Sequence, residues 1–106
     1  MSDKPEGVVR LGDLVSYQEG SVVSRTIVKN AAGTITVFAF DQGQALSEHT
    51  AAFDALIQVL EGEAETTVGG TGRQLGVGDS ILLPANIPHA VNAVSRFKML
   101  LTMLKG

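Results

Sequence analysis

The sequence predicts a single all-β domain of the sandwich or barrel type. The chain has 106 residues, which is near the usual size of one domain, and no Pro/Ser-rich linker or change in composition divides it. Short runs of β-branched and aromatic residues follow one another, separated by turns that contain glycine. No stretch has a helical period long enough to cover a parallel sheet, so the runs indicate a sandwich or barrel.

The first clear element is a β-hairpin. Residues 22–28 and 34–40 are rich in β-branched and aromatic side chains, and a turn at residues 30–33 joins them. Glycine or proline breaks separate the runs that follow. These later predicted strands cover residues 53–60, 64–68, 80–83 and 97–104.

The first 20 residues are treated as a separate N-terminal segment. Apolar side chains at Leu11, Leu14 and Val15 predict either one short helical turn or an edge strand there. The predicted domain boundaries are therefore 1–20 for this segment and 21–106 for the β-barrel.

Composition excludes several classes of function. The net charge is −3 and the eight Lys and Arg residues are scattered, so the basic patch that phosphate binding requires is missing, and we expect neither nucleic acid nor membrane as a partner. No apolar stretch is long enough to span a bilayer and no secretory signal pattern is present, which leads us to expect a cytoplasmic protein. With no cysteine, packing must stabilise the fold without disulfides.

Two spaced motifs carry the chemical information. Gly43, His49 and Gly62 stand in the order and spacing of the pattern G-x5-H-x-H-x3-E-x6-G. Further along, Gly78 is followed after five residues by the segment 84–89, Pro-Ala-Asn-Ile-Pro-His, which resembles the pattern G-x5-P-x-G-x2-H-x3-N, with Asn92 one place early. Both patterns are those of the cupin superfamily, and the chain resembles a small single-domain cupin with a jelly-roll type β-barrel.

The resemblance implies a metal site, and this chain departs from it at two of four positions. In the family, three histidines and one carboxylate hold a divalent metal. Here Ala51 replaces the second histidine and Ala55 replaces the carboxylate, which leaves His49 and His89. Because two neutral imidazoles lack an anionic ligand, we expect no certain cofactor and at most a weakly bound Zn, Ni, Mn or Fe ion.

The same two histidines are expected to lie in an apolar cavity. Side chains two apart in a strand share a face, so residues 51, 53, 55, 57 and 59 are expected to face inward with His49. The nearest carboxylates, Glu48 and Asp54, have the opposite parity and would face inward only if a bulge shifted the strand. The residues predicted to line the ligand pocket are His49, Ala51, Phe53, Ala55, Ile57, His89 and Met99.

Loop geometry is expected to survive although half of the ligands are absent. Asn86 stands where the family has glycine, and asparagine is one of the few other residues that tolerate positive φ. The alternative is a purely structural role, in which His49 and His89 are core histidines bonded to backbone carbonyls or water. In the motif context we give the functional interpretation equal weight.

Three functions remain open. The first is binding of a small molecule in the apolar cavity anchored by the two histidines. The second is a metal-dependent cupin enzyme of the oxygenase, isomerase or lyase type with a reduced two-histidine site. The third is metal-free acid/base catalysis by the histidine pair.

A homodimer is also predicted. The run 97–104 is apolar on both faces, and Leu56 and Leu60 repeat this on another strand. A β-domain of this size has few ways to cover both faces, so the outward apolar residues are expected to meet those of a second copy, as is common among small cupins.

Overall fold

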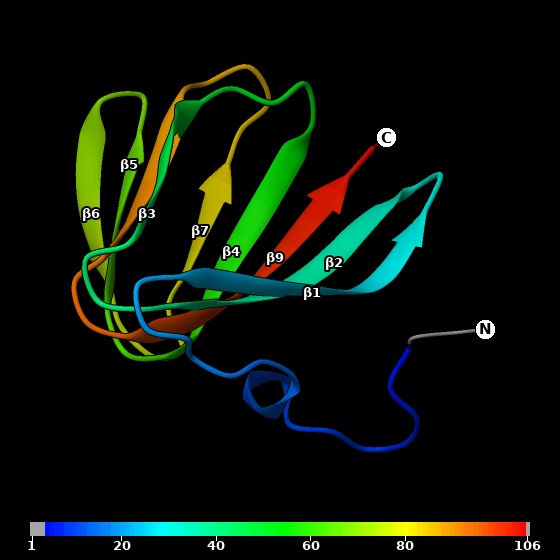
Figure 1. The fold of residues 1–106 in the computed structure, drawn as a ribbon. Helices are drawn as coiled ribbons and strands as arrows, with labels where there is room; N and C mark the ends of the chain where they lie inside the picture. Colours follow the sequence, from blue (N-terminus) through cyan, green and yellow to red (C-terminus); the bar gives the residue numbers. More distant parts are fainter. Residues whose placement is uncertain (1–3, 106) are drawn as a thin grey trace.

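The computed structural model describes residues 4–105 and consists of two facing antiparallel sheets (Figure 1). One sheet has five strands in the order β1-β2-β9-β4-β7, and the other has four in the order β3-β8-β5-β6. The bounds are η1 Leu11–Leu14, β1 Val22–Asn30, β2 Gly33–Phe40, β3 Ala45–His49, β4 Asp54–Glu61, β5 Ala64–Val68, β6 Thr71–Leu75, β7 Ser80–Leu83, β8 His89–Ala93 and β9 Phe97–Leu104. The prediction of an all-β domain is confirmed, with a single 3-10 turn as its helical part.

The predicted hairpin is present as β1 and β2. The two strands pair from Val22 opposite Phe40 to Asn30 opposite Gly33. The turn suits its residues, because the side-chain oxygen of Asn30 accepts a hydrogen bond from the backbone N–H of Ala32. Glycine is also required at position 33, because a Cβ atom there would clash with the carbonyl oxygen of Met103 on β9.

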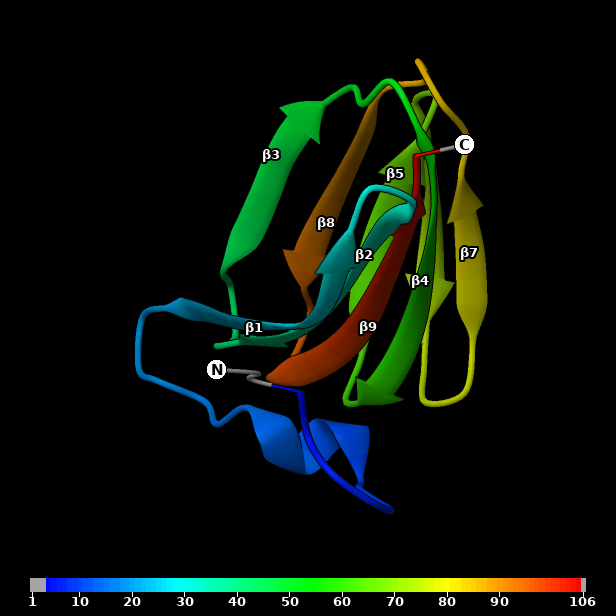
Figure 2. The same cartoon turned by 90° about the vertical axis from the view of Figure 1, so that its right-hand side faces the viewer.

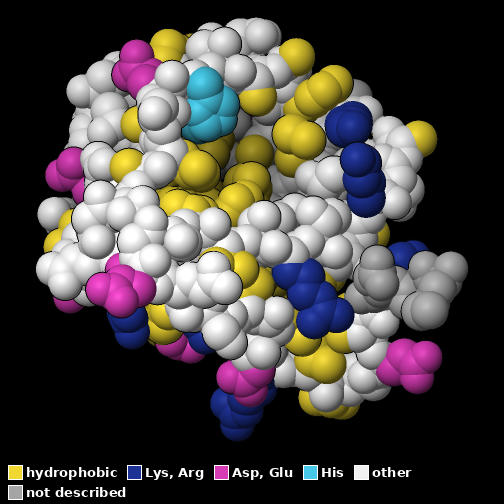
Figure 3. Space-filling model, viewed as in Figure 1, with side chains coloured by type: hydrophobic (Ala, Val, Ile, Leu, Met, Phe, Trp, Pro, Cys, Tyr) yellow, Lys and Arg dark blue, Asp and Glu magenta, His cyan; other side chains and the backbone are white. Residues whose placement is uncertain are grey.

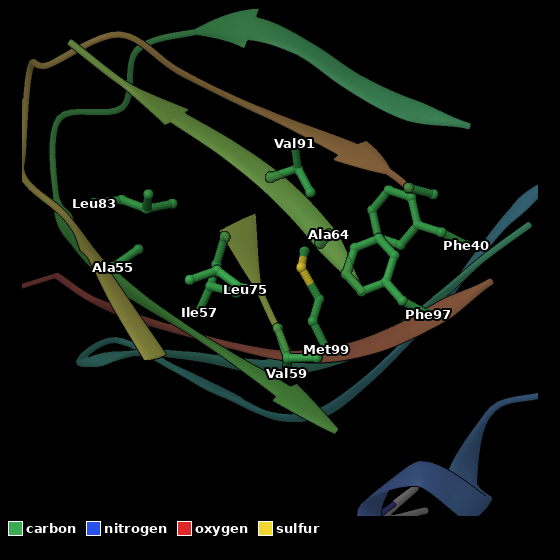
Figure 4. Close-up of a cluster of buried hydrophobic side chains, with 11 residues drawn as sticks. Phe40, Ala55, Ile57, Val59, Ala64, Leu75, Leu83, Val91, Phe97 and Met99 are labelled. Carbon is green, nitrogen blue, oxygen red and sulfur yellow. The ribbon is translucent and has the colours of Figure 1, made fainter. Parts of the chain in front are cut away.

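The main core lies between the two sheets (Figure 4). Phe40 and Phe97 stack with ring centroids 4.5 Å apart, and both are fully buried. Toward the other end, Ile57 and Met99 from the five-stranded sheet face Val91 of the four-stranded sheet. Burying such side chains stabilises the fold by about 1.5–3 kcal/mol each.

A second apolar cluster lies on the outer face of the five-stranded sheet. Val37 and Ala39 of β2 point outward, yet both are fully buried, because residues 11–17 pack over them. We call residues 11–17 the N-terminal strap, and Figure 2 shows its 3-10 turn below the strands. Of the two alternatives for this segment, the structure has the helical turn.

The described part of the chain, residues 4–105, contains no helix long and apolar enough to cross a membrane. Residues 1–3 of the predicted N-terminal segment and residue 106 of the predicted barrel lie outside the described residues.

Candidate functional site

His49 and His89 come together at one end of the barrel. His49 is the last residue of β3 and His89 the first of β8, and the two are direct partners in the antiparallel register. Their Nε2 atoms are 3.1 Å apart, and their rings meet edge to face with centroids at 4.3 Å. His89 is buried, at 6% exposure, whereas His49 is exposed to solvent.

A bulge in β3 brings His49 to the inner face. Leu46 pairs with Val91 and His49 pairs with His89, so three steps along β3 match two along β8. Leu46 packs against the core, and without the extra residue its parity would point Glu48 inward in place of His49. From the sequence, a bulge was a possible way to turn Glu48 toward the cavity. In the structure the bulge turns His49 inward, and Glu48 stays exposed.

The loop before His89 holds its position through backbone geometry. Asn86 has φ of 65°, which confirms the predicted positive φ, and its backbone N–H donates to the carbonyl of Ala51 at 2.7 Å. Asp54 is also engaged with this loop, because its Oδ1 accepts a hydrogen bond from the N–H of Ala85 at 2.8 Å. Asp54 is exposed, so it supports the loop from outside and leaves the interior without its charge.

The backbone fixes the hydrogen on one nitrogen of each imidazole. Nδ1 of His49 lies 2.8 Å from the carbonyl oxygen of Ser47, and Nδ1 of His89 lies 3.2 Å from that of Ile87. A carbonyl oxygen only accepts hydrogen bonds, so both Nδ1 atoms carry hydrogen and both Nε2 atoms of the neutral rings are acceptors. Two lone pairs therefore face each other across 3.1 Å, an arrangement that suits an electrophile bound by both nitrogens.

Burial opposes protonation of His89. The pKa of His89 is lowered from its ordinary value, first by burial and second by the nearby charge of His49, while its bond to the Ile87 carbonyl acts in the other direction. A doubly protonated pair would place two positive charges in contact beside apolar walls. Burial and the neighbouring imidazole thus both favour the neutral form of His89.

An apolar cavity of about 80 Å³ lies behind the two imidazoles. Figure 3 shows a hollow with hydrophobic side chains inside and a histidine at its rim. No Asp, Glu, Lys or Arg is among the lining residues. The lining consists of Leu46, His49, Ala51, Ala55, Ile57, Leu83, His89, Val91, Met99, Leu101 and Met103.

The structure brings together six of the seven residues predicted for the pocket, and Phe53 lies outside the lining. Phe53 is 37% exposed. The parity argument assumed one unbroken strand from His49 onward, but β3 ends at His49 and β4 begins at Asp54, so the count does not hold across residues 50–53. Within β4 it holds again, because Ala55, Ile57 and Val59 are all buried.

Sequence reasoning missed five lining residues. Leu46 and Val91 come from the four-stranded sheet, and Leu83, Leu101 and Met103 from the five-stranded sheet. The alternation along the last strand did carry a signal, since Met99, Leu101 and Met103 share one face. The other three, Leu46, Leu83 and Val91, could be identified only once the strands were paired in register.

The two imidazoles fit part of a metal site. Histidine nitrogens lie about 2.0–2.1 Å from a bound zinc ion, so two nitrogens at adjacent coordination positions are about 3 Å apart. The two Nε2 atoms have this separation. Donation of Nδ1–H to a backbone carbonyl is also the usual support of a metal-ligating histidine. However, residues 4–105 contain no group of three or more His, Cys, Asp or Glu side chains able to hold an ion, and Ala51 and Ala55 line the cavity in their place.

The cupin domain model matches residues 36–104. This chain belongs to the cupin family. Its fold is accordingly the cupin double-stranded β-helix, and the resemblance of the two sequence motifs is confirmed. Among curated proteins, no match to the chain was found.

Solved structures match most or all of the chain. A conserved protein of unknown function from Streptococcus pyogenes is 35% identical with a TM-score of 0.92, over 100% of this chain and 93% of that one. A cupin superfamily protein from Desulfitobacterium hafniense is 30% identical with a TM-score of 0.91, over 97% and 95% of the two chains. A cupin 2 conserved barrel protein from Leptotrichia buccalis is 42% identical with a TM-score of 0.86; 89% of this chain spans about half, 46%, of that one.

Proposed function

We propose that this cupin binds a small molecule in the apolar cavity behind His49 and His89. The observation that carries the proposal is the placement of two imidazoles, with their Nε2 atoms 3.1 Å apart, at the mouth of a cavity that is otherwise apolar. A pocket with apolar walls and few fixed polar groups is the usual form of a small-molecule site. The walls bury the ligand's carbon chain, and the imidazoles bind its polar end.

The size of the cavity limits the ligand. An apolar cavity of about 150 Å³ holds benzene, so 80 Å³ encloses about three heavy atoms by the same ratio. Because His49 is exposed, the polar end of a slightly longer molecule can remain at the mouth, in contact with water. Short alcohols therefore serve as probes of the site.

The test is a titration of the isotope-labelled protein with 1-butanol, followed by NMR chemical shifts. We expect saturable shifts at the residues that line the cavity, and loss of saturation in His49→Ala and His89→Ala. Leu82→Ala is the matched control, because Leu82 is 56% exposed and outside the cavity lining. Shifts that are linear, or equal in all variants, would contradict binding at this site.

A metal-dependent enzyme is the second candidate, favoured by the 3.1 Å separation of the two Nε2 atoms. His49 and His89 would hold the ion, which would supply Lewis-acid or redox chemistry when bound. Metal analysis after chelation and reloading tests this candidate. Retention of one ion per chain, abolished by His49→Ala or His89→Ala, would support it.

A matched gain-of-function variant sharpens that test. Ala51→His combined with Ala55→Glu supplies the two ligands that the family pattern has at these positions. We expect the double variant to retain a divalent ion at least ten times more tightly than the parent protein, because it adds an imidazole and an anionic ligand. Equal retention of one ion per chain by both proteins would show that the parent's two-histidine site is already complete, and retention by neither would contradict a metal site at this position.

The third possibility, metal-free acid/base catalysis, requires that the two imidazoles reach each other, and their contact meets this condition. No reaction follows from the contact alone. The possibility stays a prediction, tested by whether a variant that loses the pair also loses any activity found for the protein.

A further inference from the structure

Thr66 is a polar residue that the proposed site has not used. It lies in the middle of β5 on the inner face, with Ala64 and Val68 as its neighbours two residues away, and both of these pack in the core. Its exposure is 0%. Within residues 4–105, its Oγ1 is the buried side-chain oxygen or nitrogen that has no hydrogen-bond partner.

An unpaired hydroxyl at such a position is unfavourable. Taking a hydroxyl out of water without a compensating hydrogen bond destabilises a protein, and a valine of nearly the same shape would avoid this. Threonine can also donate and accept at once, so its hydroxyl can bond to most polar groups. A partner that enters the barrel from outside would offset the cost.

The register places Thr66 beside the cavity. Val91, which lines the cavity, is the direct partner of Thr66 in the sheet. Side chains of such partners have Cβ atoms about 4.5–5.5 Å apart. Figure 4 shows Val91 directed into the interior, toward Ile57, Leu83 and Met99, which line the opposite wall.

Thr66 also lies deeper in the barrel than the histidines. On the same two strands, Val68 pairs with His89 and Thr66 pairs with Val91. Two residues along a strand correspond to about 7 Å. Thr66 therefore lies one level deeper than the imidazoles and beside the Val91 part of the cavity wall, and it is not itself among the lining residues.

We propose that Thr66 is the inner anchor of the ligand pocket, and that the ligand is a short chain of about three to four carbons with a hydrogen-bonding group at each end. This inference rests on the proposed small-molecule function and adds the class of ligand. One polar group binds at His49 and His89, the carbon chain contacts the apolar walls, and the other polar group bonds to the Thr66 hydroxyl. Three to four carbons and the inner polar atom exceed the roughly three heavy atoms that the cavity encloses, so the wall beside Thr66 moves outward when such a ligand binds.

The experiment compares two probes that differ in one hydroxyl, 1,4-butanediol and 1-butanol, by NMR titration. One net hydrogen bond corresponds to about a three- to tenfold change in affinity, so we expect the wild-type protein to bind the diol tighter by this factor. In Thr66→Val the two probes should bind equally, with the affinity for 1-butanol unchanged. Thr66→Ser, which keeps the hydroxyl, should restore the preference for the diol.

Thr67→Val is the matched control. Thr67 is the next residue on β5 and points to the other face of the sheet, so removal of its hydroxyl should leave the preference unaltered. Thermal unfolding gives an independent readout: Thr66→Val should unfold a few degrees higher than wild type, since it removes an unpaired buried hydroxyl. If Thr66→Val does not fold, it will show no cooperative transition. The diol preference of Thr66→Ser, which keeps the hydroxyl, then decides whether Thr66 is the inner anchor.

The outcomes separate the two proposals. Saturable but equal binding of both probes to the wild-type protein would overturn the role of Thr66 and leave the small-molecule pocket intact. The same conclusion follows if Thr66→Val keeps the preference for the diol. If neither probe binds the wild-type protein, the small-molecule function itself fails, and the inner anchor fails with it.

Discussion

Two polar clusters lie on opposite sides of the five-stranded sheet: the two histidines, on β3 and β8 of the other sheet, lie on its inner side, and the second cluster lies on its outer face. They differ in whether their members find partners within the chain. Inside, His49 and His89 contact each other among apolar walls that carry no charged side chain. Outside, Lys98 of β9 is also buried, at 8% exposure, but its Nζ donates to the carbonyl of Gly12 at 2.6 Å and lies 3.4 Å from Glu61.

The outer cluster is satisfied by its own residues. The Tyr17 hydroxyl donates to Glu61 at 3.0 Å. The pKa of Tyr17 is raised to about 12, mainly because the side chain is partly buried and secondly because of this hydrogen bond. Arg96 and Lys98 both lie near the face of the Tyr17 ring, at 5.4 and 5.0 Å from its centroid. All of these contacts attach the N-terminal strap to the sheet, so we interpret the cluster as structural. The inner pair has two nitrogen acceptors that face each other, and these are available to bind a ligand.

The strongest test of this contrast is Lys98→Met, which keeps an apolar stem and removes the ammonium group. We expect the free energy of unfolding to fall by about 1–3 kcal/mol, because the Gly12 carbonyl and Glu61 lose a charged partner. Urea unfolding followed by circular dichroism measures it. Lys29→Met on the exposed part of β1 is the control; an equal change in both variants would mean that the strap contact contributes nothing.

The second test concerns the part of the outer face that the strap leaves open. Leu82 and Leu104 are 56% and 61% exposed, and we propose that they meet a second copy of the chain in a homodimer. Light scattering after size exclusion should give twice the chain mass for wild type. For Leu82→Glu it should give the monomer mass at tenfold higher concentration, because the apolar contact would bury a carboxylate without a partner. A monomeric wild type at micromolar concentration defeats the idea.

The third test addresses the loop that positions His89. Asn86→Ala should lose about 1 kcal/mol of stability, because alanine tolerates the positive φ of this residue poorly. Asn86→Gly should differ from wild type by only a few tenths of that amount. Thermal unfolding of the three proteins side by side measures the effect, and identical losses in both variants would refute the conformational explanation.

The smallest expected effect is a pH dependence at the inner pair. The folded pKa of His89 lies below its unfolded value of about 6.5, so the unfolded chain takes up its proton at the higher pH. Stability should therefore fall as the pH drops from about 7 through 6.5 toward the folded pKa. In His89→Gln this part of the fall should be absent. Thermal unfolding at pH 8, 7, 6 and 5 compares the two proteins, and parallel curves would contradict the assignment.

The sequence predicted the mouth of the barrel better than its surroundings. The spacing of His49 and His89 within the two motifs was sufficient to expect them in one site, and the replacements at Ala51 and Ala55 were sufficient to expect an apolar interior. The position of Phe53 was not predictable in this way, because alternation holds only within one strand and β3 ends before Phe53. The outer cluster was not predicted either, since Lys98 and Gly12 are 86 positions apart.

The sequence by itself determined the features that depend on neighbouring residues: the β-hairpin, the glycine-containing turns, the positive φ of Asn86 and the kinds of side chain at the barrel mouth. These follow from local sterics and from the alternation of side chains along a strand. Only the tertiary structure decided the features that depend on strand pairing. The β3 bulge turns His49 inward, the carbonyls of Ser47 and Ile87 leave both Nε2 atoms as acceptors, and the packing around Thr66 leaves its hydroxyl unpaired. Contacts of this kind arise between segments far apart in the chain, where the register of the sheets, and no local pattern, sets which atoms meet.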